Sequence, residues 1–217
     1  MDEIRIPAGE ATLAGNLTAV DKPVGLVLFV HGSGSSRHSP RNQFVARKLN
    51  DAGLATLLFD LLTPEEEAED EYTARFRFDI QLLAERLVLA TNWARQQEAV
   101  AHLPIGYFGS STGGGAALVA AAQLPADVGA VVSRGGRPDL AGDALSKVRA
   151  PTLLIVGGLD DVVIELNEKA ARQMRCEVKL EIVPGATHLF PEPGALERVA
   201  DLASAWFVIH LAGKQDL

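Results

Sequence analysis

The chain has 217 residues, of which 47% are hydrophobic and 22% are charged, and its formal net charge is −8. This length corresponds to about one domain, whose core is large enough to fold without disulfide bonds or structural metals. The acidic balance argues against a nucleic-acid-binding protein, because such proteins normally carry a basic surface. Since Cys176 is the only cysteine, the chain cannot form an internal disulfide, which is typical of reducing compartments.

The sequence carries no signal for export or membrane insertion. Its first ten residues, MDEIRIPAGE, lack the basic segment and the apolar block of a signal peptide. No apolar run approaches the roughly 20 residues of a transmembrane helix. No linker or low-complexity tract divides the chain. We therefore predict a cytoplasmic protein that forms a single domain over residues 1–217 and binds neither membranes nor nucleic acid.

The predicted strands begin with a weakly alternating segment at the N-terminus. Gly9 and Gly15 punctuate this segment, which we interpret as a hairpin or meander at the edge of a sheet. Nearly continuous aliphatic runs follow, as expected of strands that are buried on both faces. They cover residues 25–32, 55–60, 105–110, 128–133 and 151–157. The last run, 176–183, alternates more and is expected nearer an edge.

Helical patterns lie between these runs. They cover residues 43–52, 73–97, 112–123, 162–174 and 196–211. The alternation of strand and helix predicts an α/β fold with a mostly parallel sheet and helices on both faces. The acidic run Glu65–Glu71 is interpreted as a solvated loop or the start of a helix.

The unusual polar residues follow the predicted strands. In an open parallel sheet, ligands bind outside the carboxyl ends of the strands. The segment His31–Ser36 follows the first long strand, GSSTG at residues 109–113 follows the third, Asp160 and Asp161 follow the fifth, and His188 comes after the last. We therefore expect the functional site at this edge.

The segment GSSTG matches the motif G-x-S-x-G, with Ser111 at its centre. In this motif a strand turns sharply into a helix, and the flanking residues must be small because the two elements come close. A packing turn without chemistry is the alternative. A phosphate-binding loop fits less well because no G-K-[ST] is present, and a dinucleotide fingerprint starting at Gly32 has Arg37 in place of its third glycine. We predict that Ser111 is a nucleophile.

A serine nucleophile needs a base, for which histidine is suited because its pKa lies near neutrality. The order of serine, acid and histidine along α/β-hydrolase chains favours His188. The acid then lies between these two residues, where Asp160 and Asp161 are both candidates. One would orient the imidazole, and the other would cap a helix. The remaining histidines are His31, His38, His102 and His210.

Backbone N–H groups are expected to stabilise the oxyanion. One should come from Thr112, which follows the nucleophile. The second is expected from Ser33, with Gly34 as second choice, unless this segment is merely a surface loop. No metal site is expected, because the sequence has no H-E-x-x-H and its histidines are scattered. Cys176 is interpreted as a small hydrophobic residue.

Four segments together resemble the dienelactone-hydrolase-like family of α/β-hydrolases. They are VLFVHGSGSS, GYFGSSTGGG, LLIVGGLDDVV and PGATHLF. The resemblance implies the α/β-hydrolase fold and favours Asp160 over Asp161 as the acid. Residues 35–67 resemble a subgroup that also occurs fused to phosphoribosyltransferase domains, although no such second domain is expected here.

The chain departs from the dienelactone hydrolases proper, whose nucleophile is cysteine, because it has Ser111 instead. This difference favours a general ester as substrate. Many relatives insert a lid where this chain has only residues 133–150, so a large cap domain is not expected. Arg134 and Arg137 lie in that segment; they could bind a substrate carboxylate, but a solvated surface role is the more common one.

We therefore predict a serine hydrolase, similar to carboxylesterases, that cleaves small esters through Ser111, His188 and Asp160 without a cofactor. The alternatives are a hydrolase fold that only binds its ligand, and a thioesterase, peptidase or dienelactone-type hydrolase. Whether the chain forms a homo-oligomer stays open.

Overall fold

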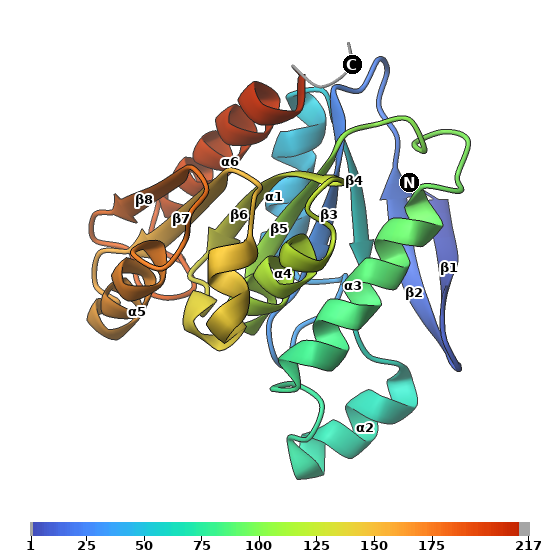
Figure 1. Ribbon diagram of the computed structural model, residues 1–217, viewed down its shortest axis with the longest axis horizontal. Helices are drawn as coiled ribbons and strands as arrows, with labels where there is room; N and C mark the ends of the chain where they lie inside the picture. Colours follow the sequence, from blue (N-terminus) through green and yellow to red (C-terminus); the bar gives the residue numbers. More distant parts are fainter. Residues whose placement is uncertain (1, 213–217) are drawn as a thin grey trace.

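Six parallel strands form the centre of an eight-stranded sheet, and an antiparallel hairpin extends one edge (Figure 1). The computed structural model describes residues 2–212. The sheet order is β1-β2-β4-β3-β5-β6-β7-β8. The strands are β1 (Asp2–Ala8), β2 (Ala11–Thr18), β3 (Gly25–Val30), β4 (Leu54–Phe59), β5 (Ile105–Ser110), β6 (Val128–Arg134), β7 (Thr152–Gly157) and β8 (Val178–Val183).

Helices cover both faces of the sheet. Helices α1 and α6 pack on one face, and α3, α4 and α5 pack on the other (Figure 1). They are α1 (Pro40–Asp51), α2 (Pro64–Thr73), α3 (Ile80–Ala94), α4 (Thr112–Gln123), α5 (Asp161–Ala171) and α6 (Ala195–Ala212), with a 3₁₀ segment at Pro138–Lys147. No helix within residues 2–212 combines the length and the apolar character needed to span a bilayer.

This arrangement confirms the predicted α/β-hydrolase fold with a mostly parallel sheet. The N-terminal hairpin and β8 lie at the two edges, as their alternating sequences indicated. The segment after β6 contains only the 3₁₀ segment, so it forms no large cap.

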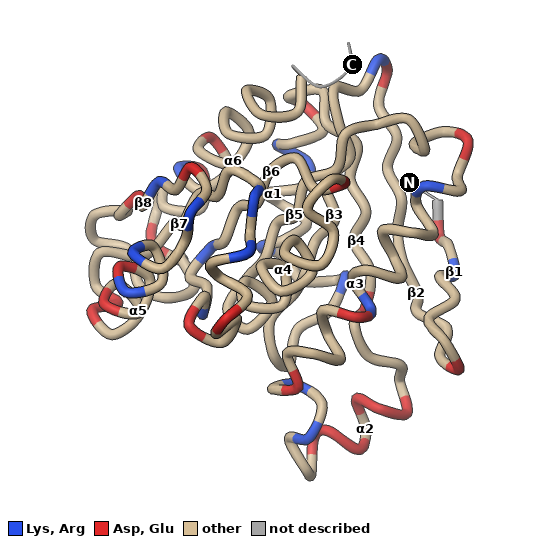
Figure 2. The backbone as a smooth tube through the Cα atoms, in the orientation of Figure 1, with Lys and Arg blue, Asp and Glu red and all other residues tan. Residues whose placement is uncertain are grey.

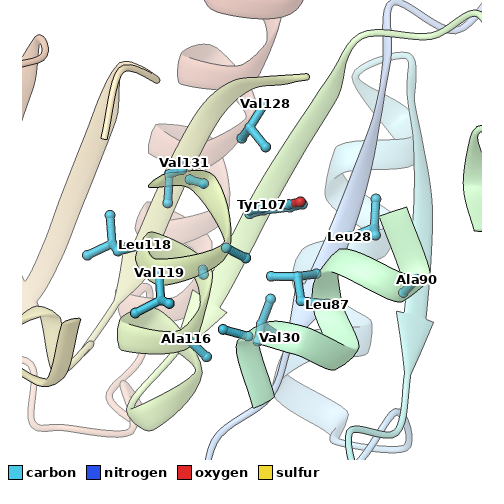
Figure 3. Packing of buried hydrophobic residues seen from close by; sticks show 14 of the residues in the cluster. Leu28, Val30, Leu87, Ala90, Tyr107, Ala116, Leu118, Val119, Val128 and Val131 are labelled. Atoms are coloured by element: carbon cyan, nitrogen blue, oxygen red, sulfur yellow. The ribbon is translucent and has the colours of Figure 1, made fainter. Parts of the chain in front are cut away.

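The core has two layers because successive side chains of a strand point to opposite faces. In β3, Leu28 and Val30 belong to the cluster under α3 and α4, whereas Val27 and Phe29 belong to the cluster under α1 and α6. Figure 3 shows side chains of α3 and α4 packed around Tyr107 in the first cluster. The alanine and glycine residues of α4 let this helix lie close to the sheet.

The helix expected over residues 73–97 is too long, because α2 already ends at Thr73 and α3 covers only Ile80–Ala94. Ala74 ends α2 in a left-handed conformation with φ 52°, and Asp79 begins α3 by accepting a hydrogen bond from the Leu82 N–H at 3.0 Å. The buried Asp70 carboxylate accepts hydrogen bonds from the backbone N–H groups of Phe76 and Arg77, at 2.6 and 3.1 Å. These local bonds to the connecting backbone compete with helix formation.

The acidic run Glu65–Glu71 lies within α2, so the helix interpretation is confirmed and the loop interpretation is wrong. Thr63 and Glu66 form a capping box, in which each side chain bonds to the other residue's backbone N–H. Glu66 also accepts a hydrogen bond from Arg86 Nη1 on α3 at 2.6 Å. Figure 2 shows acidic residues along α2. Those in the first turn are expected to interact favourably with the dipole at the helix N-terminus.

His31 ties the loop after β3 to the segment after β4. Its Nε2 accepts a hydrogen bond from the Leu61 N–H at 3.0 Å, so the ring proton is on Nδ1, which donates to the Gly32 carbonyl at 3.0 Å. Burial lowers the pKa of His31, so the neutral ring persists in the folded protein. Protonation of Nε2 would break the bond to Leu61.

We expect the His31→Gln substitution to reduce the pH dependence of stability. Because the folded pKa lies below the unfolded value of 6.5, the stabilisation from His31 is complete above pH 6.5 and declines as the pH falls. Between pH 7.5 and 5.5 this amounts to at most about 1.4 kcal/mol. Urea unfolding at both pH values should show a smaller loss for His31→Gln than for the wild type.

The exposed His102 offers a control, and His102→Gln should keep the wild-type pH dependence. If His31→Gln and the wild type lose the same stability between these pH values, His31 does not act in this way.

Candidate active site

Ser111 lies in the turn between β5 and α4, with φ 51° and ψ −123°. A non-glycine residue in this conformation is strained. The surroundings enforce it, because a Cβ atom on Gly113 would lie 2.1 Å from the Val30 carbonyl oxygen, and one on Gly109 would lie 2.6 Å from that of Gly113. Strand and helix therefore approach as closely as the motif predicted. Ser111 itself is partly exposed at the tip of the turn.

Neighbouring strands hold the turn from two sides. The Ser111 N–H donates to the Arg134 carbonyl at 3.3 Å, and the Ser111 carbonyl accepts from the Arg137 N–H at 3.0 Å. On the other side, a Cβ atom on Gly32 would lie 3.0 Å from Ser111 Cβ. The loop after β3 and the end of β6 thus both contact the serine.

The structure brings His188 and Asp160 together. His188 Nδ1 lies 2.6 Å from Asp160 Oδ2, across loops that follow β8 and β7. The carboxylate side chain is only 18% exposed, and the imidazole side chain is 40% exposed. A short bond from Nδ1–H to a shielded carboxylate fixes the ring orientation and leaves Nε2 unprotonated, so that it can accept a proton.

Asp161 takes no part in this pair. It is exposed and is the first residue of α5, whereas Asp160 occupies the N-cap position without capping the helix through its side chain. The expectation that the second aspartate caps a helix is therefore wrong. The geometry agrees with the choice of Asp160 that the family resemblance implied.

Ser111 and His188 both border the end of β6. The Arg134 carbonyl accepts a hydrogen bond from the Ser111 N–H. A Cβ atom on the next residue, Gly135, would lie 3.5 Å from Nδ1 and Cε1 of His188. Within residues 2–212, however, no hydrogen bond joins the Ser111 hydroxyl to the His188 ring. The acid and the base are thus in contact, and the serine and the histidine lie against the consecutive residues Arg134 and Gly135.

The predicted oxyanion donors, Ser33 and Thr112, contact each other. The Ser33 N–H donates to Thr112 Oγ1 at 3.1 Å. The Ser33 hydroxyl donates to the Arg77 carbonyl at 3.2 Å, so its 3.1 Å contact with Thr112 Oγ1 has the threonine as donor. The backbone N–H groups of Thr112 and Gly34 have no acceptor in the part of the chain that is described.

A cavity of about 230 Å³ lies beside Ser33. The loop His31–Ser36 forms one wall, and α2 forms another. Leucines give it an apolar side, while Glu67 and Glu71 add carboxylates. Burial raises the pKa of Glu67, and the charges of Asp60 and Glu71 act in the same direction.

The contribution of α2 to this region was not predicted from the sequence. Its position directly after the carboxyl end of β4 was the available signal. Asp60 follows β4, where the dinucleotide alternative would need an acid to bind the ribose. Its carboxylate instead accepts hydrogen bonds from the backbone N–H and the guanidinium of Arg37. That pairing removes the acid on which this alternative depended.

The two candidate substrate-binding arginines differ in environment. Arg137 forms two hydrogen bonds to Asp139, at 2.8 and 2.7 Å, and is partly exposed. Arg134 is buried, with 6% of its surface exposed. The expected solvated surface role therefore fits Arg137, whereas it is wrong for the buried Arg134.

Neither a cluster of metal ligands nor Cys176 provides a further functional site in the described part of the chain. Among residues 2–212, no three His, Cys, Asp or Glu side chains are grouped as metal ligands would be. Cys176 is half-buried, and burial raises the pKa of its thiol. A thiol in this environment is a poor nucleophile.

Curated relatives and solved structures resemble the chain over nearly its whole length. The crystal structure of a dienelactone hydrolase from Anabaena variabilis is 59% identical, covers 97% of both chains and has a TM-score of 0.95. Est1E from Butyrivibrio proteoclasticus with bound ferulic acid has a TM-score of 0.82 at 19% identity, over 96% of this chain and 99% of its own, and so shares the fold.

Two Mycobacterium tuberculosis proteins, from different strains, are 59% identical over 212 residues. They carry the provisional name of phosphoribosyl transferases. The match covers 98% of this chain but 47% of theirs, so the chain spans about half their length. A model of the dienelactone hydrolase family matches residues 11–206. The chain therefore belongs to the dienelactone hydrolase family, within the α/β-hydrolase fold.

Proposed function

We propose that the protein is a serine hydrolase that cleaves small esters through an acyl-enzyme. The observation that carries this proposal is the 2.6 Å contact between His188 Nδ1 and Asp160 Oδ2 beside the strained turn at Ser111. A base held by an acid beside a partly exposed serine is the arrangement that nucleophilic catalysis requires. The name of the Anabaena variabilis relative, a dienelactone hydrolase, agrees with hydrolysis of an ester or lactone.

In the first step, His188 Nε2 takes the proton of the Ser111 hydroxyl as its oxygen attacks the substrate carbonyl. Asp160 stabilises the imidazolium that forms. The imidazolium then protonates the leaving alcohol, and a water molecule releases the acyl group by the same route. The serine hydroxyl must first reach Nε2, and rotation about its χ1 angle is one way to do so. Catalytic hydrogen bonds often tighten only when substrate is bound.

The oxyanion would be held by backbone N–H groups. The Thr112 N–H has no acceptor among residues 2–212 and can therefore donate to the oxyanion. The Ser33 N–H is engaged with Thr112 Oγ1, so it can serve only if the oxyanion replaces the threonine hydroxyl as its acceptor. An anionic acceptor forms the stronger bond, which favours this exchange in the transition state.

The substrate is expected to be small. The cavity beside Ser33 holds about 230 Å³, and the segment after β6 adds no large cap. Serine rather than cysteine at position 111 favours a general ester over the dienelactone. A thioester would use the same residues, and a panel of both substrates would separate the two.

The transferase name of the M. tuberculosis relatives concerns proteins about twice as long as this chain. We therefore propose no transferase activity for this chain. Cytoplasmic location and organisation as a single domain stay predictions.

Replacement of Ser111 by alanine should lower kcat by a factor on the order of 10⁶, because the nucleophile and its base act as a unit. Hydrolysis of p-nitrophenyl acetate by purified protein measures the loss. The exposed Ser146 provides the control, and Ser146→Ala should keep wild-type activity. A loss below tenfold for Ser111→Ala would rule out the nucleophile. An inactive wild type would favour a protein that only binds its ligand.

The two aspartates should differ sharply. Asp160→Asn is expected to reduce kcat by about 10⁴, because an amide cannot stabilise the charged imidazole and favours the wrong tautomer. Asp161→Asn removes the same charge one residue away and should stay within about twofold of the wild type, as is usual for an exposed position. The same ester assay compares them. Equal losses in both variants would contradict the role given to Asp160.

A further inference from the structure

Arg134 is a buried guanidinium without a counter-charge. No carboxylate of residues 2–212 lies within 4.0 Å of it. Its Nη2 donates to Asn42 Oδ1 at 3.3 Å, and its Cζ lies 5.9 Å from the centre of the Phe190 ring. Its Nε is buried and has no acceptor in the described part of the chain. A buried charge is normally paired, because removal from water is costly.

A second arginine increases this excess of positive charge. Arg41 lies in the first turn of α1, and its buried Nε also has no acceptor among residues 2–212. Burial, and after it the charge of Arg41, lower the pKa of Arg134 to about 10. The Arg134 guanidinium therefore remains charged at neutral pH.

The N-terminus of α1 beside the two arginines also favours the binding of an anion. The two arginines lie by the N-terminus of α1, where the helix dipole favours negative charge. The backbone N–H of Arg41 has no acceptor in the described chain either. Arg41 and Phe190 also line an open groove of about 440 Å³, together with Glu192 and Glu197. Arg134 does not line this groove, which gives a ligand access from solvent to Arg41.

The surroundings of Arg134 and Arg41 border the proposed catalytic residues. Arg134 precedes Gly135, which packs against His188, and Phe190 follows His188 by two residues. The hydroxyl of Ser110, next to Ser111, donates to Asn42 Oδ1 at 3.2 Å. A group bound by the arginines would thus lie next to the histidine loop and the nucleophile turn.

We propose that Arg134 and Arg41 form a binding site for a carboxylate or phosphate group. The group could belong to the substrate or to a free anion, and both supply oxygens to which guanidinium donors bind strongly. If the anionic group belongs to the substrate, this inference rests on the proposed ester hydrolysis. If the site binds a free anion, the inference is independent of that proposal.

The first experiment measures anion binding without catalysis. Thermal unfolding of the wild type is followed with inorganic phosphate or succinate, at constant ionic strength set with sodium chloride. We expect the midpoint to rise with either anion, because a ligand of the folded state stabilises it. Arg41→Gln and Arg134→Gln should lose this shift. Arg149→Gln removes an exposed charge and should keep it.

The second experiment asks whether the anion is part of the substrate. The probes are mono-p-nitrophenyl succinate and the uncharged p-nitrophenyl butyrate, which have acyl chains of similar length. If the substrate carries the anion, the wild type has a KM at least tenfold lower for the succinate. Both arginine variants then lose this preference, so that their KM values for the two esters become equal. Equal KM values together with a phosphate shift assign the site to a free anion.

The inference is overturned if neither anion raises the midpoint and the two esters have equal KM values. It is also overturned if Arg41→Gln and Arg134→Gln keep the wild-type shift. If one variant fails to fold, the other still decides, because the two arginines lie on separate elements. Absence of all ester hydrolysis would count against the proposed function, while the unfolding experiment would still judge the anion site.

Discussion

The close approach of α4 to the neighbouring strands is the constraint on which the site depends. Gly113 lies so near the Val30 carbonyl that any side chain would collide with it. This contact forces the chain through a sharp turn and holds Ser111 at a positive φ of 51°. The packing of the core stabilises the strained turn. The serine is thereby presented at the carboxyl edge of the sheet, where the loops carrying Asp160 and His188 also end.

Hydrogen bonds between loops complete the site. His31 joins the loop after β3 to Leu61, and the hydroxyl of Ser33 joins it to Arg77. Arg77 in turn binds Asp70 through Nε at 2.6 Å. The segment that contains α2 is therefore linked to the loop expected to bind the oxyanion. Carboxylates of α2 border one side of this region, and the unpaired arginines lie near the histidine loop. The proposed substrate would thus have negative carboxylates on the α2 side and positive guanidinium groups on the side of the histidine loop.

The sequence predicted the sheet well, because strands buried on both faces leave continuous aliphatic runs. It also predicted the turn at Ser111, since only glycine fits at positions 109 and 113. It did not predict the break between α2 and α3, because the left-handed Ala74 and the bonds made by Asp70 depend on tertiary contacts. The burial of Arg134 was equally hidden, because position 134 ends a strand without any apolar signal. The physical arguments left Asp160 and Asp161 equivalent, and only the family resemblance separated them before the geometry was known.

Reaction with a fluorophosphonate tests the central claim most directly, because this reagent forms a covalent bond only with an activated serine. Intact mass spectrometry followed by peptide mapping identifies the modified residue. The account predicts one added group, on Ser111, and a strong reduction of labelling in the Asp160→Asn variant. An unmodified protein, or a group on any other residue, would contradict the catalytic arrangement.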